Sequence, residues 1–187
     1  MKEQIEIEYK ILISEHIFKQ IIEDYQNRIE NDYIQINHYL THPILQAKKY
    51  MLRIREKNNQ YELTLKRPYQ NHRLETNVDF SSKDKDRILN HQKIDNEIIN
   101  ILNQEGIPQE KLENQFSLTT HRYDIPLQYG LLSIDENTYL NQKDYEIEFE
   151  VTDEEKGFKQ FLEIIQPYSL NYTKNCPSKI KRVLDHL

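Results

Sequence analysis

Alternation of apolar and polar residues dominates this chain. The run Ile5-Glu6-Ile7-Glu8-Tyr9-Lys10 has a two-residue period, which is the repeat of a β-strand, because successive side chains of a strand point to opposite faces. Turn-forming residues between Lys57 and Gln60 indicate a hairpin. The pattern predicts strands near residues 3–13, 32–41, 49–57, 60–67, 72–80, 115–124, 129–137 and 144–151.

Apolar residues at helical spacing interrupt these strands. The expected helix starts are Ser14, Ser81 or Ser82, Thr152 (with Glu155 as a capping box), and about Pro177. Gly106 and Pro108 end the second helical region. Eight antiparallel strands with few helices predict an α+β protein. No Gly/Ser/Pro-rich segment separates two halves, so one domain over residues 1–187 is expected.

Composition narrows the setting. The chain has 187 residues, a net charge of −6 and one cysteine, Cys176. The single cysteine excludes an intramolecular disulfide, and we interpret it as structural. No apolar run approaches the length of a membrane span, and the N-terminal residues do not resemble a signal peptide. We therefore expect a cytoplasmic protein that binds neither membrane nor nucleic acid.

One face of each predicted strand is charged, and the sign of the charge is sorted by strand. Acidic residues dominate the first and last strands, whereas basic residues dominate the third and fourth. One interpretation is a sheet whose charged face is simply exposed to water. The other is a closed eight-stranded barrel whose charged face points inward and whose apolar face is covered by the helices. An interior of this kind requires water, ions and a charged ligand, because unpaired buried charge is costly.

The residue types indicate what that ligand is. Carboxylates two positions apart on a strand lie ~6.6 Å apart along it, and carboxylate oxygens suit hard cations such as Mg²⁺ or Mn²⁺. Arginine and lysine on other strands suit phosphate oxygens. Acidic and basic strands together predict a site for a metal-bound polyphosphate.

The ordered series of charged residues resembles a known family. Glu6-Ile7-Glu8-Tyr9-Lys10 is similar to the ExExK signature of the CYTH superfamily, the triphosphate tunnel metalloenzymes, and in particular to its small bacterial single-domain members. ExExK alone is a weak motif, but later residues agree in order over almost the whole chain. They are Arg53-Ile54-Arg55, Lys66, Glu75, Arg122, Asp135, Glu146-Ile147-Glu148 and Ser178-Lys179.

The resemblance implies an eight-stranded antiparallel tunnel and a role for each matching residue. The implied metal ligands are Glu6, Glu8, Glu75, Asp135, Glu146 and Glu148. The implied triphosphate-binding residues are Lys10, Arg53, Arg55, Lys66, Arg122 and Lys179, with Glu6, Glu8, Arg53 and Arg55 as the catalytic set. Thr120 stands where many members carry a further basic residue, and Glu150 extends the acidic series beyond the two expected positions.

Three functions fit this reading. The first is hydrolysis of tripolyphosphate or an organic triphosphate with Mg²⁺ or Mn²⁺ as cofactor. The second is an adenylate cyclase, in which a ribose hydroxyl attacks the α-phosphorus. The third is a module that binds a polyphosphate or nucleotide without turnover. The residues favour the first and leave the other two open.

Overall fold

The computed structural model describes residues 2–186 and divides them into two compact units. The first unit holds residues 2–6 and 35–118, and the second holds residues 7–34 and 119–186. Each unit is therefore assembled from distant parts of the sequence, and each is described by itself below.

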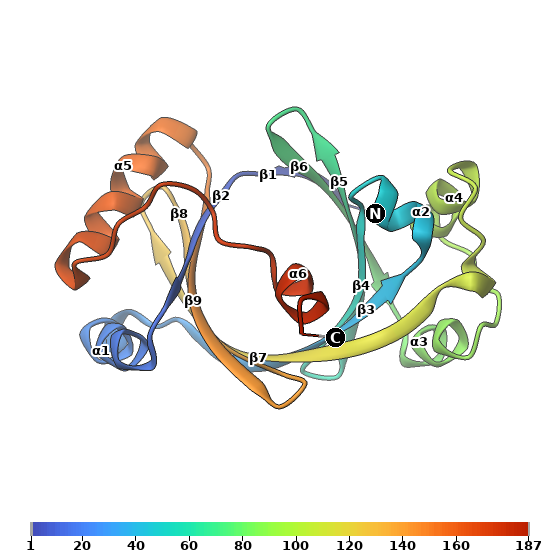
Figure 1. Ribbon diagram of the computed structural model, residues 1–187, viewed down its shortest axis with the longest axis horizontal. Coiled ribbons are helices and arrows are strands. Elements are labelled where there is room, and N and C mark those ends of the chain that lie inside the picture. Colours follow the sequence, from blue (N-terminus) through green and yellow to red (C-terminus); the bar gives the residue numbers. More distant parts are fainter. Residues whose placement is uncertain (1, 187) are drawn as a thin grey trace. The chain divides into compact units, whose positions relative to one another are not determined.

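β-Strands form the framework of both units (Figure 1). Their bounds are β1 Lys2–Glu6, β2 Glu8–Ile13, β3 Asn31–Thr41, β4 Met51–Lys57, β5 Gln60–Tyr69, β6 His72–Phe80, β7 Glu113–Leu127, β8 Gly130–Tyr139 and β9 Gln142–Val151. In the first unit the strand order is β1-β6-β5-β4-β3, and in the second it is β7-β8-β9-β2. The pairings within these runs are antiparallel, which confirms the predicted fold class.

The predicted first strand, residues 3–13, is two strands that end on either side of Ile7. The pairing partners give the physical reason. Residues 2–6 pair with β6, whereas residues 8–13 pair with β9. Glu6 therefore belongs to the first unit and Glu8 to the second. Alternation alone could not reveal this break, because the sequence pattern continues through Ile7.

The helices begin where capping residues allow. Their bounds are α1 Glu15–Tyr25, α2 Pro43–Ala47, α3 Ser82–Leu89, α4 Glu97–Gln104, α5 Glu154–Ile165 and α6 Lys179–Leu184. Ser14 and Ser81 cap α1 and α3 as expected, since each side chain accepts a hydrogen bond from the third following backbone N–H. The cap of α5 is Asp153, not Thr152, because the Asp153 carboxylate accepts from the backbone N–H of Lys156.

Helices cover the apolar face of the strands in both units. In the first unit, Leu52, Ile54 and Leu63 pack in one core with Ile98 and Leu102 of α4. In the second unit, the core joins apolar residues of β8 and β9 to α1 and α5; it includes Ile134, Ile147, Phe149, Ile21 and Phe161. The opposite face of the strands carries the charged residues. None of the helices in residues 2–186 is long and apolar enough to cross a membrane.

Candidate active site

Three charged residues lie in register across β7, β8 and β9 of the second unit. Arg122 pairs with Asp135, and Asp135 pairs in turn with Glu146. Glu148 lies two residues further along β9, opposite Lys10 of β2. Directly paired residues share one face of an antiparallel sheet. The strand pairing therefore gathers these charges on the face opposite the apolar core.

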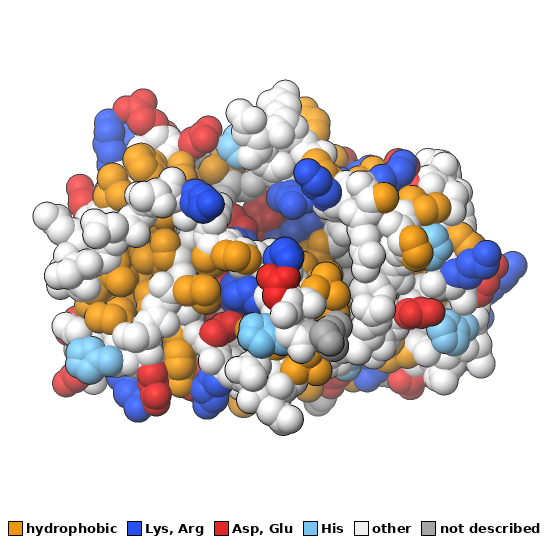
Figure 2. Space-filling model, viewed as in Figure 1, with side chains coloured by type: hydrophobic (Ala, Val, Ile, Leu, Met, Phe, Trp, Pro, Cys, Tyr) orange, Lys and Arg blue, Asp and Glu red, His pale blue; other side chains and the backbone are white. Residues whose placement is uncertain are grey.

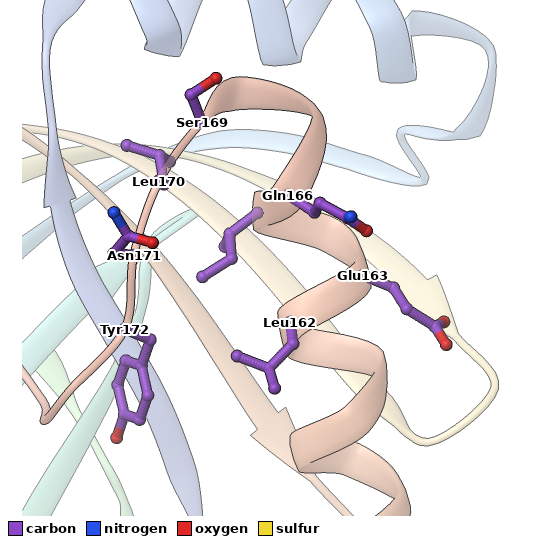
Figure 3. Close-up of a pocket in the computed structure, with 8 residues that line it drawn as sticks. Leu162, Glu163, Gln166, Ser169, Leu170, Asn171 and Tyr172 are labelled. Atoms are coloured by element: carbon purple, nitrogen blue, oxygen red, sulfur yellow. The ribbon is translucent and has the colours of Figure 1, made fainter.

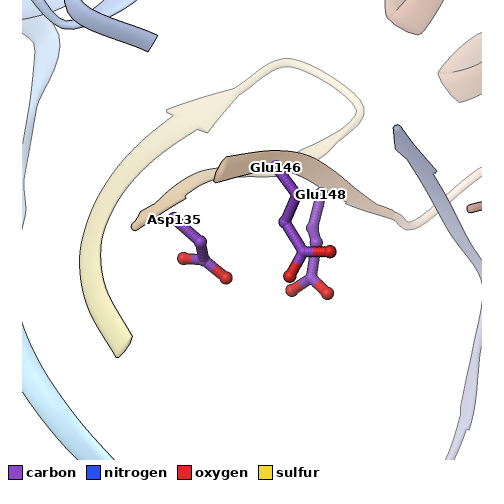
Figure 4. Close-up of side chains that lie close together, drawn as sticks. All are labelled: Asp135, Glu146 and Glu148. Carbon is purple, nitrogen blue, oxygen red and sulfur yellow. The ribbon is translucent and has the colours of Figure 1, made fainter. Parts of the chain in front are cut away.

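Three carboxylates of this face form a compact cluster (Figure 4). Asp135, Glu146 and Glu148 each offer one oxygen, and these oxygens lie within 4.8 Å of one another. Asp135 and Glu146 are fully buried. Three carboxylates this close together, two of them buried, repel one another unless cations compensate them. The same oxygens are the hard donors that Mg²⁺ and Mn²⁺ prefer, so the residues fit such an ion.

Arg122 provides one compensating charge. Its Nε and Nη2 donate to the two oxygens of Asp135 at 2.7 and 2.6 Å, a two-pronged pairing that fixes both side chains. Burial alone would raise the pKa of the Asp135 carboxyl, but the charges of Arg122 and Lys179 hold this pKa below its usual range. Asp135 is therefore ionised at neutral pH.

Lys179 provides a second charge, from the first turn of α6. Its Nζ lies 2.8 Å from Asp135 and 2.9 Å from Glu148, and it also contacts Glu146. Burial would lower the pKa of this lysine, but Asp135, Glu146 and Glu148 hold it well above its usual range. Burial likewise opposes ionisation of Glu148, whereas Lys179, Arg122 and Lys10 hold the pKa of Glu148 well below its usual range. The ammonium thus lies where a cation is electrostatically favoured.

Arg182 joins the same cluster, and the sequence analysis did not name it. Its Nη1 donates to Glu146 at 2.9 Å, and its Nε donates to Asp144 at 2.8 Å. The signal was present in the sequence, because Arg182 follows Lys179 by three residues and such residues share a helix face. The apolar spacing of the last helix predicts only its apolar face, formed by Ile180, Val183, Leu184 and Leu187. Val183 is buried as expected, while Leu187 lies outside the described residues.

Glu8 and Lys10 are paired with each other in β2. The pKa of Lys10 is raised, because the charges of Glu8 and Glu148 outweigh the burial that would lower it.

Glu150, directly opposite Glu8 in register, is exposed and is not one of the three clustered carboxylates. Thr120 is buried, and its hydroxyl donates to Asn137 Oδ1 at 2.8 Å. This position therefore contributes a neutral hydrogen bond and no positive charge.

The first unit has its own acid–base cluster. Lys66 of β5 contacts Glu6 and lies 2.8 Å from Glu75 of β6. Burial would raise the pKa of Glu75, but the nearby charges of Lys66 and Arg53 lower it to about 2. Two predicted metal ligands and one predicted phosphate-binding residue are therefore in direct contact here.

Arg53 and Arg55 lie on the same face of β4. Arg55 is opposite Asn37 of β3 and donates from Nε to Asn37 Oδ1 at 3.3 Å. Arg53 is opposite Tyr39 and is 7 % exposed. Two arginines on one polar face, next to Lys66, form a cationic surface suited to phosphate oxygens.

A surface pocket of about 650 Å³ lies elsewhere, between α5 and residues 169–172 of the second unit (Figure 3). Its lining includes Leu162, Leu170, Asn171 and Tyr172, and no lining residue is basic. Figure 2 shows hydrophobic side chains gathered on this side of the molecule. The α5 helix packs on the apolar face of β9. The lining of this pocket therefore differs from the charged clusters on the opposite face of the strands.

Antiparallel strands that carry carboxylate and cationic side chains on one polar face define a class of protein, and known families can be compared with it. The CYTH domain family matches residues 4–176. The chain belongs to this family. It is 33% identical over 179 residues to a Bacillus subtilis (strain 168) protein described as "Putative triphosphatase YjbK", and the match covers 94% of this chain and 93% of that protein.

Solved structures agree with the family assignment. A Bacillus halodurans protein described as a "putative adenylate cyclase" has a TM-score of 0.89 at 34% identity, with 97% of this chain and 98% of that chain covered. The Hippeastrum protein HpAC1, described as having a dominant triphosphatase activity, has a TM-score of 0.79 at 17% identity and covers 97% and 96%. This second likeness concerns the fold alone.

Proposed function

We propose that this protein hydrolyses a triphosphate in a reaction that depends on a divalent metal ion. The observation that carries the proposal is the cluster of Asp135, Glu146 and Glu148, whose oxygens lie within 4.8 Å of one another on a polar strand face. The family membership and the relative described as a "Putative triphosphatase" support it.

The carboxylates of Asp135, Glu146 and Glu148 would hold Mg²⁺ or Mn²⁺, and we propose the same role for Glu8, Glu6 and Glu75. A bound ion of this kind supplies Lewis acidity and acidifies a water molecule. Asp135, Glu148 and Glu75 keep their charge at neutral pH, as their lowered pKa values indicate. Ionised carboxylates are the form that binds a metal.

The basic residues would bind the phosphate chain. Arg53 and Arg55 can each hold two phosphate oxygens in a fork, and Lys66, Lys10, Arg122 and Lys179 supply further charge. Water attacks the terminal phosphorus, the bond from that phosphorus to its bridging oxygen breaks, and orthophosphate leaves. The arginines neutralise charge on the transferred phosphoryl group and on the diphosphate that remains.

A cyclase is the second candidate, and the 34%-identical relative described as a "putative adenylate cyclase" favours it. Incubation with tripolyphosphate, ATP or thiamine triphosphate, with Mg²⁺, with Mn²⁺ or with EDTA, followed by product analysis, distinguishes the functions. Orthophosphate formed only with metal supports the triphosphatase. Cyclic AMP with diphosphate would replace that proposal by the cyclase, and binding without product would make the protein a sensor.

A matched pair of variants tests the metal site. Glu148→Gln removes a charge from the cluster, whereas Glu155→Gln removes one from an exposed pair with Lys159 on α5. We expect Glu148→Gln to lose at least about a hundredfold in turnover and Glu155→Gln to keep it, since removal of a transition-state charge contact typically costs 10²–10³ in kcat. Equal activity in the two variants would contradict the assignment of the metal cluster.

A further inference from the structure

The polar face of the first unit contains side-chain atoms that are buried and lack a hydrogen-bond partner within residues 2–186. Two of them, Asn37 Nδ2 and Arg53 Nε, are donors. Asn37 is 1 % exposed and Arg53 is 7 % exposed. Buried polar groups are almost always hydrogen-bonded, because one left without a partner destabilises the protein. Two such donors on adjacent strands therefore indicate that a bound ligand supplies the missing hydrogen-bond acceptors.

The orientation of the Asn37 amide is defined by Arg55. The Nε–H of Arg55 donates to Asn37 Oδ1 at 3.3 Å, across the direct pairing of β3 with β4. A guanidinium has no acceptor, so the atom that receives this bond must be the amide oxygen. The NH₂ group of Asn37 is consequently left to donate elsewhere.

The surroundings specify the chemistry of the missing acceptor. Asn37 Nδ2 and Arg53 Nε both require an acceptor, and the positive charges of Arg53 and Arg55 favour an anionic one. Arg53 lies opposite Tyr39 in β3, two residues from Asn37 and hence on the same strand face. Donors next to cations suit an oxyanion, whose oxygens accept several hydrogen bonds at once.

We propose that Asn37 is a substrate-binding residue: its NH₂ group donates a hydrogen bond to a non-bridging oxygen of the bound triphosphate. This inference rests on the proposed function and adds a residue to it. A neutral donor contributes a contact without adding positive charge to a face that already holds Arg53, Arg55 and Lys66. Nδ2 is shielded from solvent, so a neighbouring side chain must rotate before the ligand can reach this atom. A long arginine side chain is able to rotate in this way.

The alternative is that Asn37 only orients Arg55. Asn37→Asp separates the two roles, because the carboxylate keeps an oxygen for Arg55 and loses the NH₂ donor. Asn37→Ala removes both groups. Gln35→Glu is the matched control: it makes the same change of amide to carboxylate on the same face of β3, where Gln35 lies opposite Lys57 and leaves an acceptor, Oε1, without a partner in the described chain.

The measurement is calorimetric titration of each full-length variant with tripolyphosphate in EDTA, together with the midpoint of thermal unfolding without ligand. We expect Asn37→Asp and Asn37→Ala to weaken binding by about tenfold or more, as for loss of a hydrogen bond to a charged group. Gln35→Glu should stay within about threefold of wild type. The ligand-free unfolding midpoint of Asn37→Asp should not fall, since the variant removes an unsatisfied buried donor.

Two results would overturn the role of Asn37 and leave the proposed function standing. One is an Asn37→Asp variant that binds tripolyphosphate as tightly as wild type, which would leave Asn37 as a support for Arg55. The other is an equal loss in Asn37→Asp and Gln35→Glu, which would reduce the effect to added charge. A wild type that binds no tripolyphosphate, with or without Mg²⁺, would overturn the proposed function itself.

Discussion

The Lys179 ammonium lies 2.8 Å from the Asp135 carboxylate and bonds at the same time to Glu146 and Glu148. The family resemblance implied that this lysine binds triphosphate, yet in the structure it compensates the carboxylates assigned to the metal. A divalent cation held by these carboxylates would compete with the ammonium of Lys179 for the same oxygens. Metal binding and the position of Lys179 should therefore be linked.

Removing this lysine tests the competition. We expect Lys179→Met to lower the midpoint of thermal unfolding in EDTA, since breaking a buried ion pair typically costs ~3–5 kcal/mol. Mn²⁺ should then raise the midpoint of Lys179→Met by more than it raises that of wild type, because the competing ammonium is gone. Lys181→Met, which removes an exposed pair with Asp185, is the control. An equal Mn²⁺ effect in wild type and Lys179→Met would contradict the competition.

Stability should fall in acid through Glu75. The folded-state pKa of this carboxyl is lowered from 4.5 to about 2 by Lys66 and Arg53, against the effect of burial. A lowered folded pKa contributes stability that is complete above pH 4.5 and is lost as pH falls toward 2. At neutral pH the contribution is on the order of 3 kcal/mol. Urea unfolding of wild type and Glu75→Gln at pH 7 and pH 3 should show a free-energy difference that shrinks at the lower pH. A difference that is constant with pH would contradict the prediction.

Arg53 and Arg55 should affect turnover and not only binding. If their guanidinium groups meet charge that develops during phosphoryl transfer, Arg53→Ala and Arg55→Ala lower kcat, by roughly 10²-fold for one lost charge contact. Arg53→Lys should recover little, because lysine keeps the charge and loses the fork. Steady-state kinetics measure this, with the exposed Arg87→Ala as control. Unchanged kcat with a raised KM would show that both arginines bind the substrate and the transition state equally strongly.

Cys176 should be unreactive in the folded protein. Burial, together with the charge of Glu146, raises the pKa of its thiol to about 12, so almost none is thiolate at neutral pH. We expect iodoacetamide at pH 8 to modify native Cys176 at least about a hundredfold more slowly than the urea-unfolded chain. Mass spectrometry over time measures both rates. Similar rates would show that the thiol is not protected by the fold.

The strand faces could be predicted from the sequence because alternation is a local property. Asp135, Glu146 and Glu148 lie on one face as expected, opposite Ile134 and Ile147. Which strand pairs with which is not local, and it decided the break at Ile7 and the separation of Glu6 from Glu8. The contact of Lys179 with the acidic cluster likewise depends on where α6 packs, and helix spacing does not specify that.

Asn37 escaped the sequence analysis for a different reason. In Gln35-Ile36-Asn37-His38-Tyr39 the alternation fails, because a polar His38 is followed by an aromatic Tyr39. His38 lies on the other face of β3, where its Nδ1 bonds to Ser117 Oγ at 2.7 Å. Only the cross-strand pairing of Asn37 with Arg55 shows which face is the charged one.

The substrate preference is the last expectation. Tripolyphosphate should be cleaved with a higher kcat/KM than ATP or thiamine triphosphate, because the polar strand faces offer charges and amides for a phosphate chain. Tyr39 and Phe116 are neighbouring aromatic residues in the first unit, with ring centroids 5.3 Å apart. They are 2 % and 6 % exposed, so their rings pack on each other and leave little open surface on which a base or thiazole ring could stack. An organic group would therefore gain little contact energy, whereas each phosphate gains charge-assisted hydrogen bonds.

Side-by-side steady-state kinetics with Mg²⁺ and with Mn²⁺ measure this preference, and Tyr39→Leu identifies its cause. If the aromatic pair is only packing, Tyr39→Leu changes kcat/KM for all three substrates by the same factor, because none of them touches the ring. A loss confined to ATP or thiamine triphosphate would show that Tyr39 opens to stack on an organic ring. A clear preference of the wild type for either organic triphosphate under both metals would contradict the expectation, and it would require a ring-binding surface supplied by residues away from the strand faces, such as the exposed Tyr69.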